Sequence, residues 1–148
     1  MGIGFSASER ALISEGFGRL AADLPAATDC FYRHLFRIEP DARALFVTDL
    51  DRQGAKLAQT LEVVVGQLDR WGLLRERVVD LAIRHLAYGV RREQYRSVEE
   101  ALLAMLRERL GPELTPVAEA AWRRLLGTLC ETMMEAAYPP APVGDDPG

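Results

Sequence analysis

The residue with the most distinctive chemistry is His85, one of only two histidines in the 148-residue chain. If its segment is helical, the residues that share its face are Leu81, Ala82, Tyr88 and Gly89. This face is mostly apolar, and a buried imidazole needs a partner for each ring nitrogen. One nitrogen can donate to a backbone carbonyl one turn back, so the other must bind something across the interior of the protein.

A metal ion would satisfy that second nitrogen, because neutral imidazole is the commonest metal ligand among side chains. No second histidine or cysteine lies near His85 in the sequence, whereas a zinc site needs three or four protein ligands. A lone imidazole therefore suits a metal whose other ligands come from elsewhere, and haem supplies four nitrogens of its own. From His85 alone, a core histidine bonded to the backbone is the better-supported interpretation.

Composition narrows the class of protein. The length suits a single domain, and 49% hydrophobic residues allow a sizeable core. A net charge of -4 argues against a nucleic-acid partner, and no apolar run is long enough to span a membrane. No secretory signal is visible, and Cys30 and Cys130 form no CxxC or CxxCH motif. These features indicate a cytoplasmic protein with reduced thiols and exclude a covalently attached c-type haem.

The residues that must position His85 are expected to be all helical. Leu, Ala, Arg and Glu dominate, and no stretch alternates as a strand would. The motif Ser6–Glu9 is a capping box that begins the first helix. The later boundaries are predicted at Asp23, Pro25, Pro40, Thr48 or Asp49, Gly72, Gly89, Gly111-Pro112, Thr115 and Tyr138. The domain is expected to cover residues 1–138, and the Pro- and Gly-rich tail 139–148 to be disordered.

Three motifs in order give the chain a family resemblance. The segments "FYRHLFRIEPDARALF", "RQGAKL" and "RHLAYGVRREQYRSVEEALLAML" match runs of the bacterial single-domain globins and of the globin half of flavohaemoglobins, and Trp122 falls at a typical tryptophan of their last helix. The resemblance covers about residues 8–138. It implies a globin fold of about six to eight helices around haem b.

The resemblance also implies a set of site residues. His85 would be the proximal iron ligand, and Phe46 would lie against the porphyrin. Tyr32, Gln53 and Leu57 would form the distal side. The remaining haem contacts would be Leu57, Leu81, Val90, Tyr95 and Val98. No residue is assigned a catalytic role.

The chemistry of the distal residues agrees with this assignment. Tyr32 lies on an otherwise apolar helix face, and Gln53 and Leu57 are four residues apart, so they share a face. A phenol and an amide donor would each stabilise a negatively polarised diatomic ligand by about 1.5–3 kcal/mol in a dry pocket. Taken singly, Tyr32 is also consistent with a core tyrosine, and Gln53 with an exposed residue in a helix's first turn, which is its better-supported interpretation.

One departure concerns the proximal side. In flavohaemoglobins a glutamate near the end of the last helix, together with the tyrosine that matches Tyr95, makes the proximal histidine more anionic. Counting from Trp122 puts Ala137 in that place, with Glu135 two residues off. A less anionic histidine favours holding oxygen over cleaving it.

Reversible binding of oxygen, nitric oxide or a similar diatomic ligand is therefore the leading functional hypothesis. Nitric oxide dioxygenation with an external reductase is the alternative, because no Rossmann-type Gly-rich loop is present in the sequence. A haem-based gas sensor and a haem-free interaction module remain open. His34 is expected at the surface, and Cys30 is expected to be a small buried hydrophobe rather than a nucleophile.

Overall fold

The structure is a computed structural model, and it describes residues 4–45, 49–87 and 91–137. For residues 82–87 the description covers the helix but not the side chains. Phe46, Thr48, Tyr88, Gly89, Val90, Tyr138 and the tail 139–148 lie outside the described residues. The predictions made for those positions therefore stay predictions.

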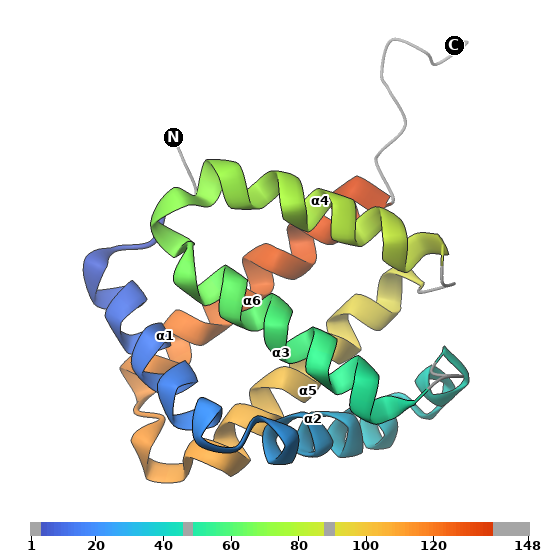
Figure 1. Cartoon of the computed structure of the whole chain (residues 1–148), viewed down its shortest axis with the longest axis horizontal. Coiled ribbons are helices and arrows are strands. Elements are labelled where there is room, and N and C mark those ends of the chain that lie inside the picture. The colour runs from blue at the N-terminus through green and yellow to red at the C-terminus, as the bar shows by residue number, and fades with distance from the viewer. Residues whose placement is uncertain (1–3, 46–48, 88–90, 138–148) are drawn as a thin grey trace, which may run out of the picture.

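The described residues form six α-helices and four short 3-10 helices, which confirms the all-helical expectation. The α-helices are α1 (Ala7–Leu20), α2 (Leu24–Ile38), α3 (Leu50–Gly66), α4 (Trp71–Ala87), α5 (Arg92–Leu110) and α6 (Pro116–Ala137). The 3-10 helices are η1 (Ala21–Asp23), η2 (Pro40–Leu45), η3 (Leu68–Arg70) and η4 (Gly111–Glu113). Figure 1 shows their order from the blue α1 to the red end of α6.

Most predicted boundaries agree with these helices. Asp49 is the N-cap of α3 and accepts a hydrogen bond from the Asp51 amide, and Gly111 ends α5 with a φ of 53° that favours glycine. The prediction at Gly72 is wrong, because the break between α3 and α4 falls earlier, at Gln67 and η3. Leu68 is buried in this turn and holds it against the core. Because α4 begins at Trp71, Gly72 lies inside its first turn.

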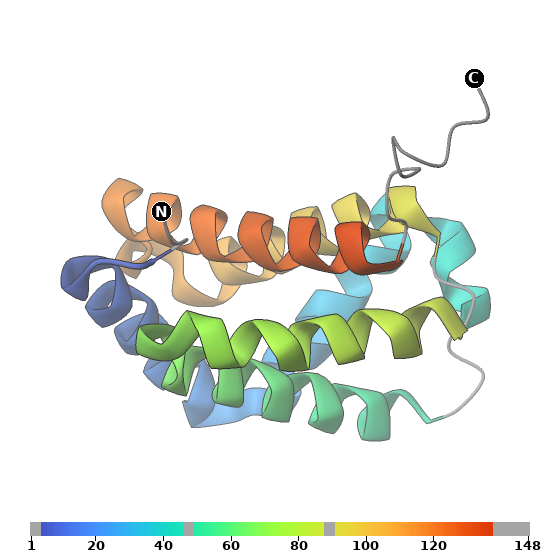
Figure 2. The same cartoon turned by 90° about the horizontal axis from the view of Figure 1, so that it is seen from above.

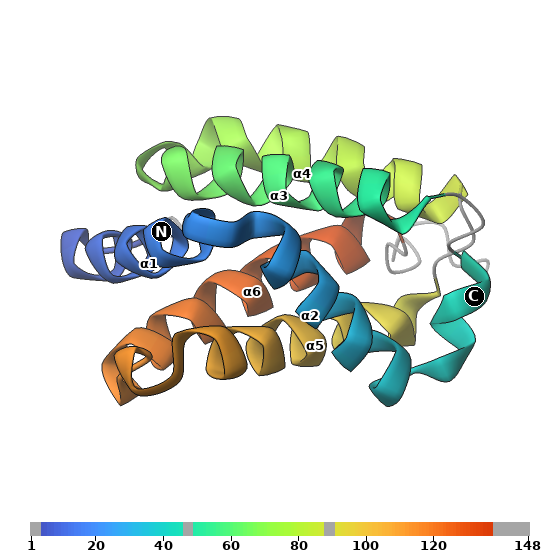
Figure 3. The same cartoon turned by 60° about the horizontal axis from the view of Figure 1, so that its bottom comes forward.

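The helices are arranged in crossing layers. Figure 3 shows α3 and α4 along one side of the molecule and α5 and α6 along the other, with α1 and α2 between them. Figure 2 gives the same division from above, with α6 facing α4. In the described residues the extensively packed pairs include α2 with α5, α2 with α3, α4 with α6 and α1 with α6. Extensive packing of α4 on α3 or on α5 is not among them.

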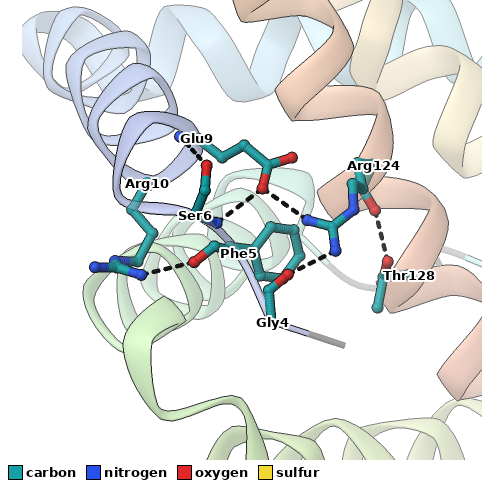
Figure 4. A network of polar contacts seen from close by, with 7 residues as sticks. All are labelled: Gly4, Phe5, Ser6, Glu9, Arg10, Arg124 and Thr128. Carbon is teal, nitrogen blue, oxygen red and sulfur yellow. Dashed lines mark hydrogen bonds and ion pairs between the residues drawn. The ribbon is translucent and has the colours of Figure 1, made fainter. Parts of the chain in front are cut away.

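A polar clamp joins the start of the chain to α6, and Figure 4 shows its members. The predicted capping box is confirmed, since Ser6 Oγ accepts from the Glu9 amide and Glu9 Oε1 accepts from the Ser6 amide. Arg124 of α6 donates to Glu9 Oε1 at 2.9 Å and to the Gly4 carbonyl at 2.6 Å. Its guanidinium also lies over the ring of Phe5, 4.6 Å from the centroid. The clamp therefore fixes α1 against α6.

Two glycines allow helices to approach closely. A Cβ built on Gly16 of α1 would lie 2.8 Å from Nε1 of Trp122 in α6, whose side chain is almost fully buried. A Cβ built on Gly54 of α3 would lie 2.8 Å from Oγ1 of Thr28 in α2. The second contact brings α3 onto α2 one position away from Gln53.

Candidate functional site

Tyr32 is the best-buried of the predicted distal residues. It lies in the middle of α2 with 6% of its surface exposed, and its ring stacks on Phe36 with centroids 5.9 Å apart. The ring of Phe31 also packs against it, at a tilted angle, with a centroid distance of 5.0 Å. Burial raises the pKa of the Tyr32 phenol to about 12. The hydroxyl therefore keeps its proton near neutral pH and is a hydrogen-bond donor.

Gln53 and Leu57 lie one turn apart near the start of α3, and both are half-buried. Residues four apart share a helix face, so the amide and the apolar side chain lie on the same side of α3. Gln53 is half-buried rather than exposed, and its assignment to the distal side stays a prediction. The close approach of Gly54 to Thr28 sets the position of this part of α3 against α2.

The proximal candidate belongs to α4. His85 lies in the last turn of α4 (Trp71–Ala87), and its side chain is outside the described part of the structure. Leu81, one turn earlier, is half-buried, and Val78 before it is buried. The helix face that carries Val78 and Leu81, and on which His85 is predicted to lie, is therefore directed into the protein one and two turns before His85.

The start of α5 carries two further candidates. Tyr95 is buried and Val98 is half-buried. Cys130 of α6 donates from Sγ to the Tyr95 carbonyl at 3.5 Å, so α6 passes close to this turn. At the end of α6, Ala137 is buried and Glu135 is exposed. The predicted absence of a carboxylate beside the proximal histidine stays a prediction, because the side chain of His85 lies outside the described part of the structure.

The sequence did not reveal a polar cluster between α2 and α5, the α2–α5 cluster, which consists of Cys30, Arg33, His34 and Glu108. His34, expected at the surface, keeps only 15% of its side chain exposed, and its Nε2 lies 2.9 Å from Glu108 Oε1 of α5. Arg33 donates to both oxygens of the same carboxylate. Cys30 is 2% exposed, as expected of a buried thiol, and it belongs to this cluster. No local signal reveals these contacts, because Glu108 is more than 70 residues away in the chain.

A hollow of about 260 Å³ lies between α1, η4 and α6. Its rim carries an ion pair between Arg19 and Glu113, and Trp122 forms part of its wall. It contains none of the candidate residues, so we do not place the functional site there. No helix in the described ranges is both long and apolar enough to cross a membrane.

The described helices, with a buried tyrosine on α2 and a histidine near the end of α4, have the all-α architecture of a globin. The profile of the globin family matches residues 29–133, and the chain belongs to that family. It is 29% identical over 106 residues to a flavohemoprotein of Rhizobium meliloti (strain 1021), a match that covers 70% of this chain and 26% of that protein. It is 30% identical over 128 residues to a flavohemoprotein of Bordetella pertussis, covering 84% of this chain and 32% of the relative. The chain thus spans a third or less of the length of these curated relatives.

Proposed function

We propose that this globin binds haem b through His85 and reversibly binds oxygen or a similar diatomic ligand beside Tyr32 and Gln53. The observation that carries the proposal is the buried, protonated Tyr32 phenol on α2 of a chain in the globin family. The similarity to two flavohemoproteins supports it from a second direction.

The described residues suit such a group. Leu57, Leu81 and Val98 are half-buried apolar side chains on three different helices, α3, α4 and α5. In the described ranges α4 is not extensively packed on α3 or α5, while both α3 and α5 are packed on α2. Half-buried apolar side chains on helices that are not extensively packed on one another fit a flat, apolar ligand that contacts several helices at once. Phe46 and Val90 are proposed as further contacts.

Haem would supply an iron with four porphyrin nitrogens and room for one imidazole and one diatomic ligand. His85 would bind from α4, with its second ring nitrogen donating to a carbonyl near Leu81 or Ala82. Tyr32 and Gln53 would donate hydrogen bonds to the diatomic ligand from the other side. Each such bond is worth roughly 1.5–3 kcal/mol, or about one to two decades in affinity.

The test of the distal assignment is stopped-flow oxygen release. Tyr32→Phe removes only a hydroxyl, and Gln53→Leu removes the amide while keeping similar bulk. Both variants should release oxygen faster, and Tyr32→Phe should do so more, because Tyr32 is buried whereas Gln53 is half-buried. Unchanged release in both variants would refute the proposed hydrogen bonds.

The similarity to flavohemoproteins favours a second candidate, nitric oxide dioxygenation with electrons from a reductase. The same residues would serve it, since it needs a held diatomic ligand and stabilised negative charge. The two candidates differ in turnover. The binding proposal predicts at most a single conversion of nitric oxide to nitrate per loaded chain, and no sustained turnover with a nicotinamide cofactor alone. Sustained turnover of the purified chain would instead support the enzyme.

A further inference from the structure

The α2–α5 cluster contains three side chains of the types that bind metal ions. Cys30 and His34 lie one turn apart on α2, and Glu108 faces them from α5. One ligand atom from each, the thiol sulfur, an imidazole nitrogen and a carboxylate oxygen, lies within 4.8 Å of the other two. Because α2 and α5 are an extensively packed pair, the fold itself holds these atoms together.

The three side chains differ in burial in a graded way. Cys30 is 2% exposed, the His34 side chain 15% and the Glu108 side chain 44%. The sulfur therefore lies at the floor of the cluster and the carboxylate at its rim. An ion held by all three would be enclosed by protein on one side and open to a water molecule on the other.

Hydrogen bonds already organise the ligand atoms. Glu108 Oε2 accepts from Arg33 Nη2 at 2.8 Å, while Oε1 lies 3.1 Å from Arg33 Nη1 and 2.9 Å from His34 Nε2. Arg37 Nη2 lies 3.0 Å from His34 Nδ1. Since a guanidinium only donates, Nδ1 accepts from Arg37 and the imidazole proton lies on Nε2, which donates to Glu108.

We propose that Cys30, His34 and Glu108 form a zinc-binding site between α2 and α5, with water as the fourth ligand. A thiolate, an imidazole and a carboxylate are all common zinc ligands, and three protein ligands plus water complete a tetrahedron. Calcium and magnesium prefer oxygen ligands alone, so this set does not suit them. The site is separate from the proposed haem contacts and does not depend on them.

Binding would require specific changes in the cluster. The Cys30 thiol would lose its proton to solvent as the sulfur–zinc bond forms, and His34 would bind through Nε2 with its proton moved to Nδ1. Glu108 would bind through Oε1 while Oε2 stays bonded to Arg33, which would hold the carboxylate in place. Arg37 would have to leave Nδ1, because that nitrogen would then carry a proton. Arg37 is exposed, so it can turn into solvent.

The two arginines therefore have opposite predicted effects, which a merely structural ion-pair cluster would not give. Arg37→Ala removes a positive charge and a competitor for Nδ1, so it should tighten zinc binding. Arg33→Ala removes the donor that orients Glu108 and should weaken it, by up to about tenfold, because the lost positive charge partly compensates.

The experiment is equilibrium dialysis of the purified full chain against chelator-buffered Zn²⁺, with zinc and iron measured separately. Wild type should bind zinc stoichiometrically, and Cys30→Ser and Glu108→Gln should each weaken binding more than about tenfold. Cys130→Ser is the matched control, because Cys130 is also a buried free thiol but lies away from the cluster. Circular dichroism of each variant shows that it is folded. If Cys30→Ser does not fold, Glu108→Gln at the exposed rim still tests the site.

X-ray absorption at the zinc edge of the loaded wild type gives a second readout. One sulfur at about 2.3 Å and nitrogen or oxygen ligands at about 2.0–2.2 Å would support the site. A shell with only nitrogen and oxygen would overturn it, as would absent zinc binding in wild type or equal binding by Glu108→Gln. Weaker zinc binding by Arg37→Ala would also contradict the proposed role of His34.

Discussion

The α1–α6 end and the α2–α3 side of this globin each contain a glycine at which two helices approach closely. In both places an added Cβ would lie 2.8 Å from a side chain of the neighbouring helix, but those side chains differ. At the α1–α6 end, a Cβ on Gly16 would meet the indole of Trp122, which is 1% exposed and fixed within the core. On the α2–α3 side, a Cβ on Gly54 would meet the hydroxyl of Thr28, a small, half-buried side chain that can rotate.

The two regions also differ in their polar groups. The α1–α6 end is closed by the clamp of Glu9, Arg124 and Phe5, whose contacts stay within the protein. The α2–α3 side presents the buried phenol of Tyr32 and the half-buried amide of Gln53. The comparison indicates that the α1–α6 end holds two helices together through packed and polar contacts. The α2–α3 side is where we propose that the diatomic ligand binds.

The largest effect on stability should follow Gly16→Ala. The new methyl group would lie 2.8 Å from Nε1 of Trp122, a large side chain that is 1% exposed. Overpacking costs about 1–3 kcal/mol, and replacing a glycine in a helix returns about 1 kcal/mol. Because a contact this short forces the indole or the helix to shift, we expect a cost near the upper end of that range. Chemical denaturation should therefore show a net loss of about 2 kcal/mol. A stabilised variant would mean that α1 can shift away from α6.

Arg124→Ala should cost somewhat less. It removes hydrogen bonds to Glu9 and Gly4 and the contact over the Phe5 ring, worth about 1–2 kcal/mol together. Arg123→Ala is the matched control on the same helix. Arg123 is half exposed and pairs with Glu119 at the surface, so its loss should cost about 0.5 kcal/mol or less. Equal losses in the two variants would show that the clamp adds nothing specific.

Glu9→Gln should lower stability in a pH-dependent way. The Ser6 amide, and then the charge of Arg124, hold the pKa of Glu9 below its ordinary value. A carboxyl whose pKa is depressed by folding adds stability above its unfolded pKa, about 4.3, and loses it as the pH falls through the lower folded value. The free energies of unfolding of wild type and variant should therefore differ at neutral pH and converge in acid. A constant difference from neutral pH to strong acid would contradict the assigned contacts.

Gly54→Ala should have the smallest effect on stability. Thr28 can turn its hydroxyl away from the new methyl group at the cost of its hydrogen bond to the Pro25 carbonyl, about 1 kcal/mol. Its Cβ, 3.1 Å from the position of the methyl group, requires only a small shift between the two helices. The helix gains about the same amount on losing a glycine, so thermal denaturation should change little. A loss as large as that of Gly16→Ala would remove the contrast between the two regions.

Local signals in the sequence were enough for the helices, because capping residues and apolar periodicity act over a few positions. Ser6, Asp49 and Gly111 marked true boundaries, and the inward face of α2 was recognised from its apolar spacing. The break was predicted at Gly72 instead of at Gln67, although Gly66 is the last residue of α3 and the buried Leu68 follows it.

The contacts of the α2–α5 cluster could not be predicted from the sequence, for a different reason. His34 and Glu108 meet only when α2 packs on α5, and neither helix carries a local mark of the other. The inward residues were assigned roles through the family resemblance, and Tyr32 and Leu57 are at least partly buried as those roles require. The roles of all the site residues stay predictions, and the side chains of Phe46, His85 and Val90 lie outside the described part of the structure.

The most direct test of haem binding through His85 is a haem titration of wild type, His85→Ala and His34→Ala, followed by visible absorption. These are the only two histidines in the chain, so each variant controls for the other. We expect wild type and His34→Ala to bind haem with the same spectrum, and His85→Ala to bind it far more weakly with an altered spectrum. An unchanged haem spectrum in His85→Ala would show that His85 is not the iron ligand.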